Sequence, residues 1–251
     1  MIRGAIFDLG STLIHFDGDW PSVIDAGLNA LTASLREQGL ALDPAAFREA
    51  FQAETEGSQR GRAVDNVERT STDVLRRALE RFGHVGVADA VVDRAIAALF
   101  AVSEAHWQPM PGLAQTLTRL RGAGLRLGMI SNASDAANVQ RLIEKAQIRS
   151  WFDPIVISAS AGIRKPDPRL FERVLEAWGL PADEVVMIGD TLGEDILGAQ
   201  SAGMLAVWIK ADADTQANRA LAGTVRPDAS VEALTDVPDL VLSLNGKPPR
   251  G

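Results

Sequence analysis

Four short polar signals in this sequence could do chemistry, and each is associated with the end of a hydrophobic run. They are Asp8 in AIFDLGSTL, Ser131 in LGMISNAS, Lys165 in GIRKPDP, and Asp190 with Asp195 in VVMIGDTLGED. A carboxylate at such a position can attack phosphorus and form a covalent intermediate. A hydroxyl and an amine can hold and neutralise an oxyanion. Paired aspartates offer hard oxygen ligands that suit Mg²⁺.

Small residues surround the first two signals. Gly10, Ser11 and Thr12 follow Asp8 and let backbone N–H groups approach an oxyanion, which makes this turn a plausible phosphate cradle. Asn132 can offer its backbone N–H to the same kind of group. The pattern therefore predicts an anion site built partly from main-chain donors.

Each signal alone also has an ordinary structural explanation. Asp8 can be a turn or helix-capping residue, and Ser131 or Asn132 can cap a helix. Lys165 can be a solvated loop lysine, and Asp190 can belong to an acidic helix start. The four signals together are far more specific than any one of them.

The elements that must position these residues can be read from the apolar spacing. Short buried runs alternate with helical patterns, which predicts a doubly wound α/β fold with a parallel sheet. In such a sheet the binding crevice lies beyond the carboxyl ends of the strands. The expected strands are Ala5–Phe7, Leu125–Ile130, Ile155–Ile157, Val185–Ile188 and Leu205–Ile209.

Residues 15–106 have a different pattern of apolar residues, because no comparable strand is expected there and the apolar spacing is helical. Asp43 followed by Pro44 is a good helix start. The flanking linkers are expected at 15–20 and 108–112. The segment therefore reads as a helical insertion.

The composition limits the possible partners. The chain has 251 residues, a net charge of −8 and no Cys. The negative field argues against general affinity for nucleic acid or anionic membranes. The absence of Cys excludes disulfides and thiolate chemistry, and no signal-peptide core or membrane span is recognised. We expect a cytoplasmic protein, a monomer or homodimer, that acts on a small molecule.

In order and content, these motifs resemble the haloacid dehalogenase-like hydrolase superfamily, most of whose members are Mg²⁺-dependent phosphatases. The resemblance spans nearly the whole chain. It implies a Rossmann-like catalytic core at 1–14 and 107–251, with an all-helical cap inserted at 15–106. Such a cap closes over the site and selects substrates.

The resemblance also implies roles for individual residues. Asp8 would be the nucleophile and a metal ligand, the carbonyl of Gly10 a second ligand, and Asp190 a third. Asp195 would bind the metal through water or orient Lys165. The phosphate would be held by Ser131, Asn132, Lys165 and the turn at Gly10.

Gly10 departs from the family pattern, because the phosphatases usually carry a second Asp there that protonates the leaving group. Its absence should slow hydrolysis of ordinary alkyl phosphates by about 10²–10⁴. The chain could act on activated esters such as sugar 1-phosphates or acyl phosphates, or borrow an acid from elsewhere. His15, Asp17 and Asp19 are the candidates for such an acid, the alternative being solvated linker residues.

Other readings follow from the same departure. Haloacid dehalogenases also lack the second Asp, but they need no metal, and Asp190 would add an unneeded charge. Phosphonatases of the superfamily use a cap lysine, and 15–106 contains no Lys. A phosphate-binding or regulatory module with impaired turnover stays open. Arg60, Arg62 and Arg69 could contact an anionic substrate or simply be solvated.

We therefore expect a Mg²⁺-dependent phosphatase of small phosphorylated metabolites that works through an aspartyl-phosphate on Asp8. The main alternative is the catalytically impaired module.

Overall fold

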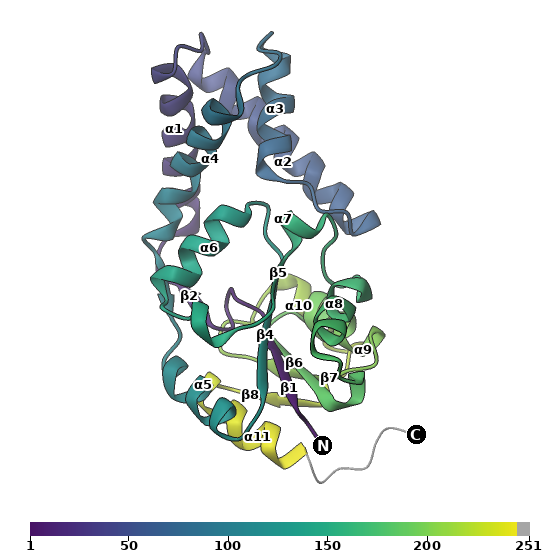
Figure 1. Ribbon diagram of the computed structural model, residues 1–251. Helices are drawn as coiled ribbons and strands as arrows, with labels where there is room; N and C mark the ends of the chain where they lie inside the picture. The colour runs from purple at the N-terminus through teal and green to yellow at the C-terminus, as the bar shows by residue number, and fades with distance from the viewer. Residues whose placement is uncertain (245–251) are drawn as a thin grey trace.

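The computed structural model describes residues 1–244 and has a six-stranded sheet at its centre. The strand order is β5-β4-β1-β6-β7-β8, and all neighbouring strands are parallel (Figure 1). The expected doubly wound α/β class is confirmed. The strands are β1 Gly4–Phe7, β4 Arg126–Ser131, β5 Ile155–Ile157, β6 Val185–Gly189, β7 Leu205–Ile209 and β8 Ala229–Val231.

Helices cover both faces of the sheet, which is why its central strands are apolar on both sides. One face packs on α5 (Leu113–Gly122), α6 (Ala136–Lys145) and α11 (Val237–Leu244). The other packs on α8 (Pro168–Trp178), α9 (Leu197–Ser201) and α10 (Gln216–Leu221). Shorter elements are α7 (Ser158–Ala161), three 3₁₀ turns (Arg149–Trp151, Ala182–Glu184, Leu234–Asp236) and a π-helical turn, η3 (Leu192–Ile196).

Four helices form a separate group beyond the carboxyl edge of the sheet, at the top of Figure 1. They are α1 (Trp20–Glu37), α2 (Pro44–Asp65), α3 (Ser71–Arg81) and α4 (Asp89–Glu104). We call this group the four-helix unit. It has its own hydrophobic core, centred on fully buried residues such as Leu35 and Phe47.

Local sequence explains where these helices begin. Asp43 caps α2 by accepting a hydrogen bond from the Ala46 N–H at 2.8 Å, as the Asp-Pro pattern predicts. Thr70 and Asp73 form a reciprocal capping box at the start of α3. These caps satisfy backbone donors that the helices cannot satisfy internally.

Two short strands join the four-helix unit to the sheet. β2 (Ile14–Phe16) pairs antiparallel with β3 (Trp107–Pro109). The expectation of no strand from residue 15 was wrong for β2, and β8 was also missed. β3 was missed too. Each of these three-residue strands contains a polar residue, so neither an alternation nor a continuous apolar run marks it, whereas β5, equally short, is wholly apolar.

Candidate active site

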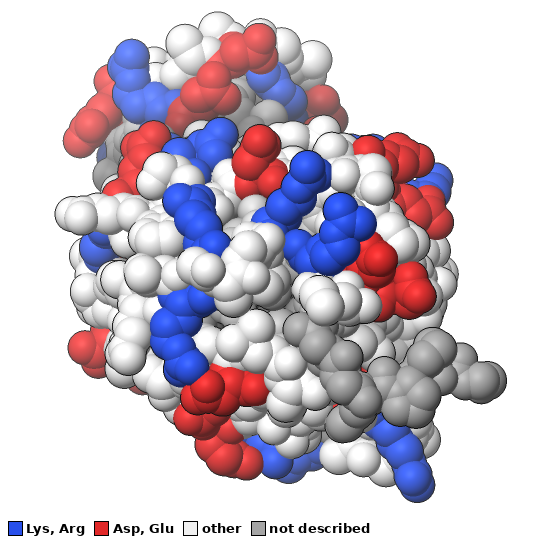
Figure 2. Space-filling view, turned by 60° about the horizontal axis from the view of Figure 1, so that its bottom comes forward, with Lys and Arg blue, Asp and Glu red and all other residues white. Residues whose placement is uncertain are grey.

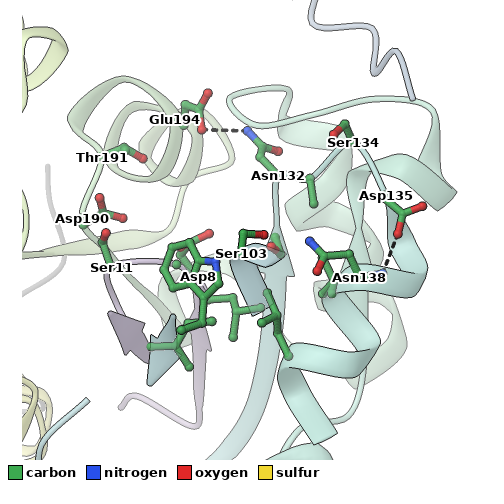
Figure 3. A pocket seen from close by; sticks show the side chains of 18 of the residues that line it. Asp8, Ser11, Ser103, Asn132, Ser134, Asp135, Asn138, Asp190, Thr191 and Glu194 are labelled. Carbon is green, nitrogen blue, oxygen red and sulfur yellow. Dashed lines mark hydrogen bonds between the residues drawn. The ribbon is translucent and has the colours of Figure 1, made fainter. Parts of the chain in front are cut away.

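The polar signals meet at the carboxyl edge of the sheet. Because β1 lies between β4 and β6, Asp8 after β1 is placed between Ser131 at the end of β4 and Asp190 after β6. All three are buried and line one cavity of about 480 Å³. Figure 3 shows Asp8, Ser11 and Asp190 toward one side of it, with Asn132, Ser134, Asp135 and Asn138 opposite.

Lys165 is buried, with 1% of its surface exposed, and its ammonium group contacts three oxygen atoms. Nζ donates to Asp8 Oδ1 at 2.6 Å, to Asp195 Oδ1 at 2.5 Å and to the Ile130 carbonyl at 2.9 Å. Burial alone lowers the pKa of Lys165, but the carboxylates of Asp195 and Asp8 raise it above its usual range. The lysine is therefore a fixed cation beside Asp8.

Asp195 is fully buried, and both of its oxygens are used inside the protein. Oδ1 binds Lys165, while Oδ2 accepts hydrogen bonds from Thr191 N at 3.0 Å and Thr191 Oγ1 at 2.6 Å. A Cβ at Gly189 would lie 2.3 Å from the Asp195 carboxyl carbon, so only glycine fits there. Of the two roles left open for Asp195, this geometry favours orienting Lys165 over binding a metal.

The carboxylates of Asp8 and Asp190 lie in a charged, water-poor environment. Burial raises the pKa of Asp8 to about 7, against the opposing effect of Lys165, and the charge of Asp195 adds to the rise. Burial also raises the pKa of Asp190 to about 8, helped by the charges of Asp8 and Asp195. With every carboxyl ionised, these three aspartates and Lys165 would leave two negative charges uncompensated.

Asn132 has a role that the sequence analysis did not foresee. Its Oδ1 accepts from Lys165 N at 2.8 Å, and its Nδ2 donates to the Lys165 carbonyl at 3.0 Å. Nδ2 also donates to Glu194 Oε2 at 2.9 Å, a hydrogen bond drawn as a dashed line in Figure 3. Glu194 in turn accepts from Arg164 Nη2 at 2.8 Å. The Asn132 amide therefore holds the backbone on which Lys165 is presented. Only its residue type, a bifunctional amide at a strand end, could have suggested this.

Gly10 lies on the floor of the cavity beneath an indole ring. A Cβ at Gly10 would contact Trp107 Cη2 at 3.6 Å, an ordinary van der Waals distance. None of the candidate replacement acids at 15, 17 and 19 lines this cavity. Asp19 caps α1 and accepts hydrogen bonds from Ser22, which lower its pKa, so it is a poor proton donor.

The four-helix unit supplies the wall opposite the sheet. Arg62, Trp20 and Phe100 line the cavity together with the sheet residues. Arg60 pairs with Glu56 on the surface, and Arg69 pairs with Asp65 at 2.6 Å. Of the three arginines considered from the sequence, the structure therefore brings only Arg62 to the cavity among the described residues.

The parallel sheet with helices on both faces makes the chain an α/β protein, and the buried aspartate–lysine pair lies at the carboxyl edge of the sheet, where such folds bind their ligands. Residues 2–203 match the haloacid dehalogenase-like hydrolase family, so the chain belongs to that family. This confirms the resemblance read from the motifs.

Individual relatives cover different shares of the chain. Over 106 residues it is 36% identical to the glyceraldehyde 3-phosphate phosphatase of Pyrococcus abyssi, a match covering 42% of this chain and 44% of that protein. It is 30% identical over 217 residues to the glyceraldehyde 3-phosphate phosphatase of Methanopyrus kandleri, covering 84% of each. The chain spans less than half the length of several curated relatives that it matches.

Among solved structures, the chain is similar to a 2-haloacid dehalogenase from Pseudomonas syringae pv. tomato DC3000. The TM-score is 0.67 and the identity 27%, with 97% of this chain and 99% of that chain covered. Similarity therefore extends to relatives named for two different reactions.

Proposed function

We propose that this protein is a Mg²⁺-dependent phosphatase that acts through an aspartyl-phosphate on Asp8. The observation that carries the proposal is that Asp8, Asp190 and Asp195 converge beside Lys165, so that these carboxyls, once ionised, hold two negative charges that Lys165 does not balance. A phosphate dianion would be repelled from such a site, whereas a divalent cation would be attracted.

The donor chemistry at the carboxyl edge fits Mg²⁺. Asp8, the carbonyl of Gly10 and Asp190 would hold the ion, because carboxylate and carbonyl oxygens are its preferred ligands. Residues 1–244 contain no cluster of three or more acidic, His or Cys side chains suited to a metal. The proposed set accordingly depends on two carboxylates and a main-chain oxygen. When bound, Mg²⁺ would neutralise phosphate charge and act as a Lewis acid.

The chain's own residues would then divide the reaction between them. The Asp8 carboxylate attacks phosphorus, the bond to the leaving oxygen breaks, and an acyl phosphate forms on Asp8. Water then attacks that phosphorus, releasing inorganic phosphate and restoring Asp8. Ser131 would hold a phosphoryl oxygen, and Lys165, whose three donors already contact Asp8, Asp195 and the Ile130 carbonyl, would neutralise phosphoryl charge from beside Asp8. With glycine at position 10, the leaving oxygen takes its proton from solvent.

The four-helix unit is proposed to act as the cap of this site. Trp20, Phe100 and Arg62 already contribute to the cavity wall. A wall made by a separate group of helices can exclude water during the reaction and contact the substrate beyond its phosphate.

Dehalogenation is the second candidate, because a similar solved structure carries that name. It would use an ionised Asp8 and an anionic substrate without a metal. Here Asp190 is buried and lines the same cavity as Asp8, and it adds a negative charge that a metal-free reaction on an anionic substrate would not need. This electrostatic setting favours the phosphatase.

The deciding experiment is phosphate release from a panel that includes acetyl phosphate, p-nitrophenyl phosphate and sugar phosphates, with Mg²⁺ or with EDTA. Asp8→Asn is the blank, because it is near-isosteric and removes the nucleophile. We expect Mg²⁺-dependent release at least about 10³-fold above this blank. Release that persists in a folded Asp8→Asn variant would remove Asp8 from its role. No release from any substrate would favour the impaired phosphate-binding module.

A further inference from the structure

A second cavity of about 540 Å³ opens from the first, between α1, α2 and α4. The two cavities share five lining residues, so the second adjoins the first on the side of the four-helix unit. The shared residues are Trp20, Arg62, Phe100, Ser103 and Ser134. Whatever is attached to a phosphate at Asp8 can therefore extend into the second cavity.

The walls of this second cavity that come from α1 and α4 are apolar. Val23 and Ile24 on α1 and Leu99 and Phe100 on α4 belong to one wall, because the two helices pack against each other at Gly27 and Leu99. Helix α2 supplies polar residues to the same cavity, among them Gln52, Thr55 and Glu56. Ile24 is 50% exposed, as is 46% of Trp20 at the junction. Covering such apolar surface with a ligand is favourable, by about 25 cal/mol per Å² removed from water.

One polar group in the second cavity has no partner. Ser58 on α2 is 4% exposed, and its Oγ makes no hydrogen bond with any residue of the described chain. A buried hydroxyl without a partner is costly. It would gain a partner from a polar substituent on a ligand in this cavity.

We propose that the substrate is an aryl phosphomonoester, with its phosphate at Asp8 and its aromatic ring in the second cavity. This inference rests on the proposed phosphatase function. Two independent observations meet in it. The cavity has an apolar wall and a size typical of ligand sites, and Gly10 supplies no acid for the leaving group. A phenolate is a far more stable leaving anion than an alkoxide, so its departure depends less on the missing proton donor.

The substrate test compares compounds that separate ring contact from leaving-group acidity. Acetyl phosphate is small and has a good leaving group, and glycerol 3-phosphate is small and has a poor one. Phenyl and 2-naphthyl phosphate have leaving phenols of similar acidity but different apolar area. We expect kcat/KM for 2-naphthyl phosphate to exceed that for phenyl phosphate by at least about tenfold, because the added ring fills the apolar cavity.

A matched pair of variants tests the location. Ile24→Asp places a charge in the second cavity at a half-exposed position, whereas Val64→Asp makes the same kind of change on α2 at a site that is 86% exposed and lines neither cavity. Ile24→Asp should lower kcat/KM for 2-naphthyl phosphate at least about tenfold while sparing acetyl phosphate. Val64→Asp should change neither.

The outcomes are distinguishable. Suppose that the enzyme releases phosphate from acetyl phosphate but does not prefer 2-naphthyl over phenyl phosphate. The aryl inference is then wrong and the phosphatase proposal stands. The same conclusion follows if the preference exists and Ile24→Asp does not reduce it. No Mg²⁺-dependent release even from acetyl phosphate would overturn the proposed function and this inference with it. Thermal unfolding of both variants shows whether the folded state is retained.

Discussion

Lys165 and Asp195 act as a pair whose geometry is set by hydrogen bonds rather than by solvent. Asp195 is held by Thr191, and Lys165 is held by Asp195, Asp8 and a main-chain carbonyl. In a buried setting an ammonium with three oxygen partners keeps its charge and its position. The lysine is thus prepared to meet an anion before any anion arrives.

The assignment of Asp195 to positioning rather than metal binding can be tested against Asp190. Asp195→Asn should lower the free energy of unfolding by about 3 kcal/mol, because it leaves a buried ammonium with one fewer counter-charge. It should keep Mg²⁺ affinity close to that of the native protein, whereas Asp190→Asn should weaken it at least about tenfold. Urea denaturation and calorimetric Mg²⁺ titration measure the two effects. If both variants lose Mg²⁺ affinity equally, Asp195 is a metal ligand and not only a positioning residue.

The cost of glycine at position 10 can be measured by restoring the acid. Only Trp107 atoms at ordinary contact distance lie near a Cβ at Gly10, so Gly10→Asp should fold. It should raise kcat/KM for glycerol 3-phosphate by about 10² and change that for acetyl phosphate much less. Gly10→Asn is the control, since it matches the shape without the acid. If both variants behave alike, proton donation to the leaving group does not limit the rate.

At the scale of elements, the four-helix unit is anchored to the sheet through the loop between α2 and α3. Glu68 N donates to the Gly162 carbonyl at 3.0 Å, and Ser71 N donates to the Ser134 carbonyl at 2.8 Å. The Glu68 side chain, which is fully buried, accepts from Ser158 Oγ at 2.7 Å and lies 2.9 Å from Arg62 Nε. One carboxylate therefore ties an arginine of the cavity wall to the sheet unit.

Removing the charge of Glu68 should loosen this anchor. Arg62 would lose its carboxylate partner, whereas Arg164, which approaches Glu68 at 3.5 Å, would keep its closer partner Glu194. We expect Glu68→Gln to lower the free energy of unfolding by about 3 kcal/mol in urea denaturation. Glu49→Gln, at an exposed position of α2, is the control and should change it by less than about 0.5 kcal/mol. A Glu68→Gln variant as stable as this control would show that the anchor is unimportant.

At the scale of the whole molecule, the net charge of −8 opposes the approach of an anionic substrate. Figure 2 shows basic and acidic side chains interspersed on one face, without a large area of one sign. Within residues 1–244, no helix is long and apolar enough to cross a membrane. Attraction of a phosphate must therefore come from the site itself.

The pH dependence of metal binding follows from the two buried aspartates. The folded-state pKa values of Asp8, about 7, and Asp190, about 8, lie above those of unfolded aspartates. The folded protein thus retains protons that the unfolded chain has lost, and metal-free stability falls as pH rises from about 4 toward 8. Mg²⁺ must displace these protons, so its affinity should rise at least about tenfold between pH 6 and pH 8.5. Thermal shift with and without Mg²⁺ at both pH values measures this. A Mg²⁺-induced shift that is equal at both values would contradict it.

The sequence by itself determined five of the six strands of the sheet, because apolar runs ended by polar residues are a local pattern. It also determined that Asp8, Ser131 and Asp190 would meet, since parallel strands bring their carboxyl ends to one edge. Helix starts such as Asp43 were equally readable, because a cap depends on residues only three positions apart.

Only the tertiary structure decided how side chains distant in sequence are oriented. Asn132 binds the backbone of Lys165, and both carboxylate oxygens of Asp195 accept hydrogen bonds from residues of the protein. These contacts depend on how the loops pack and not on the spacing of the motifs. Likewise, of three similar arginines only Arg62 lines the cavity among the described residues, because helix rotation and the burial of Glu68 select it. The second cavity could not be predicted from the sequence either, since it exists only where α1, α2 and α4 leave space between them.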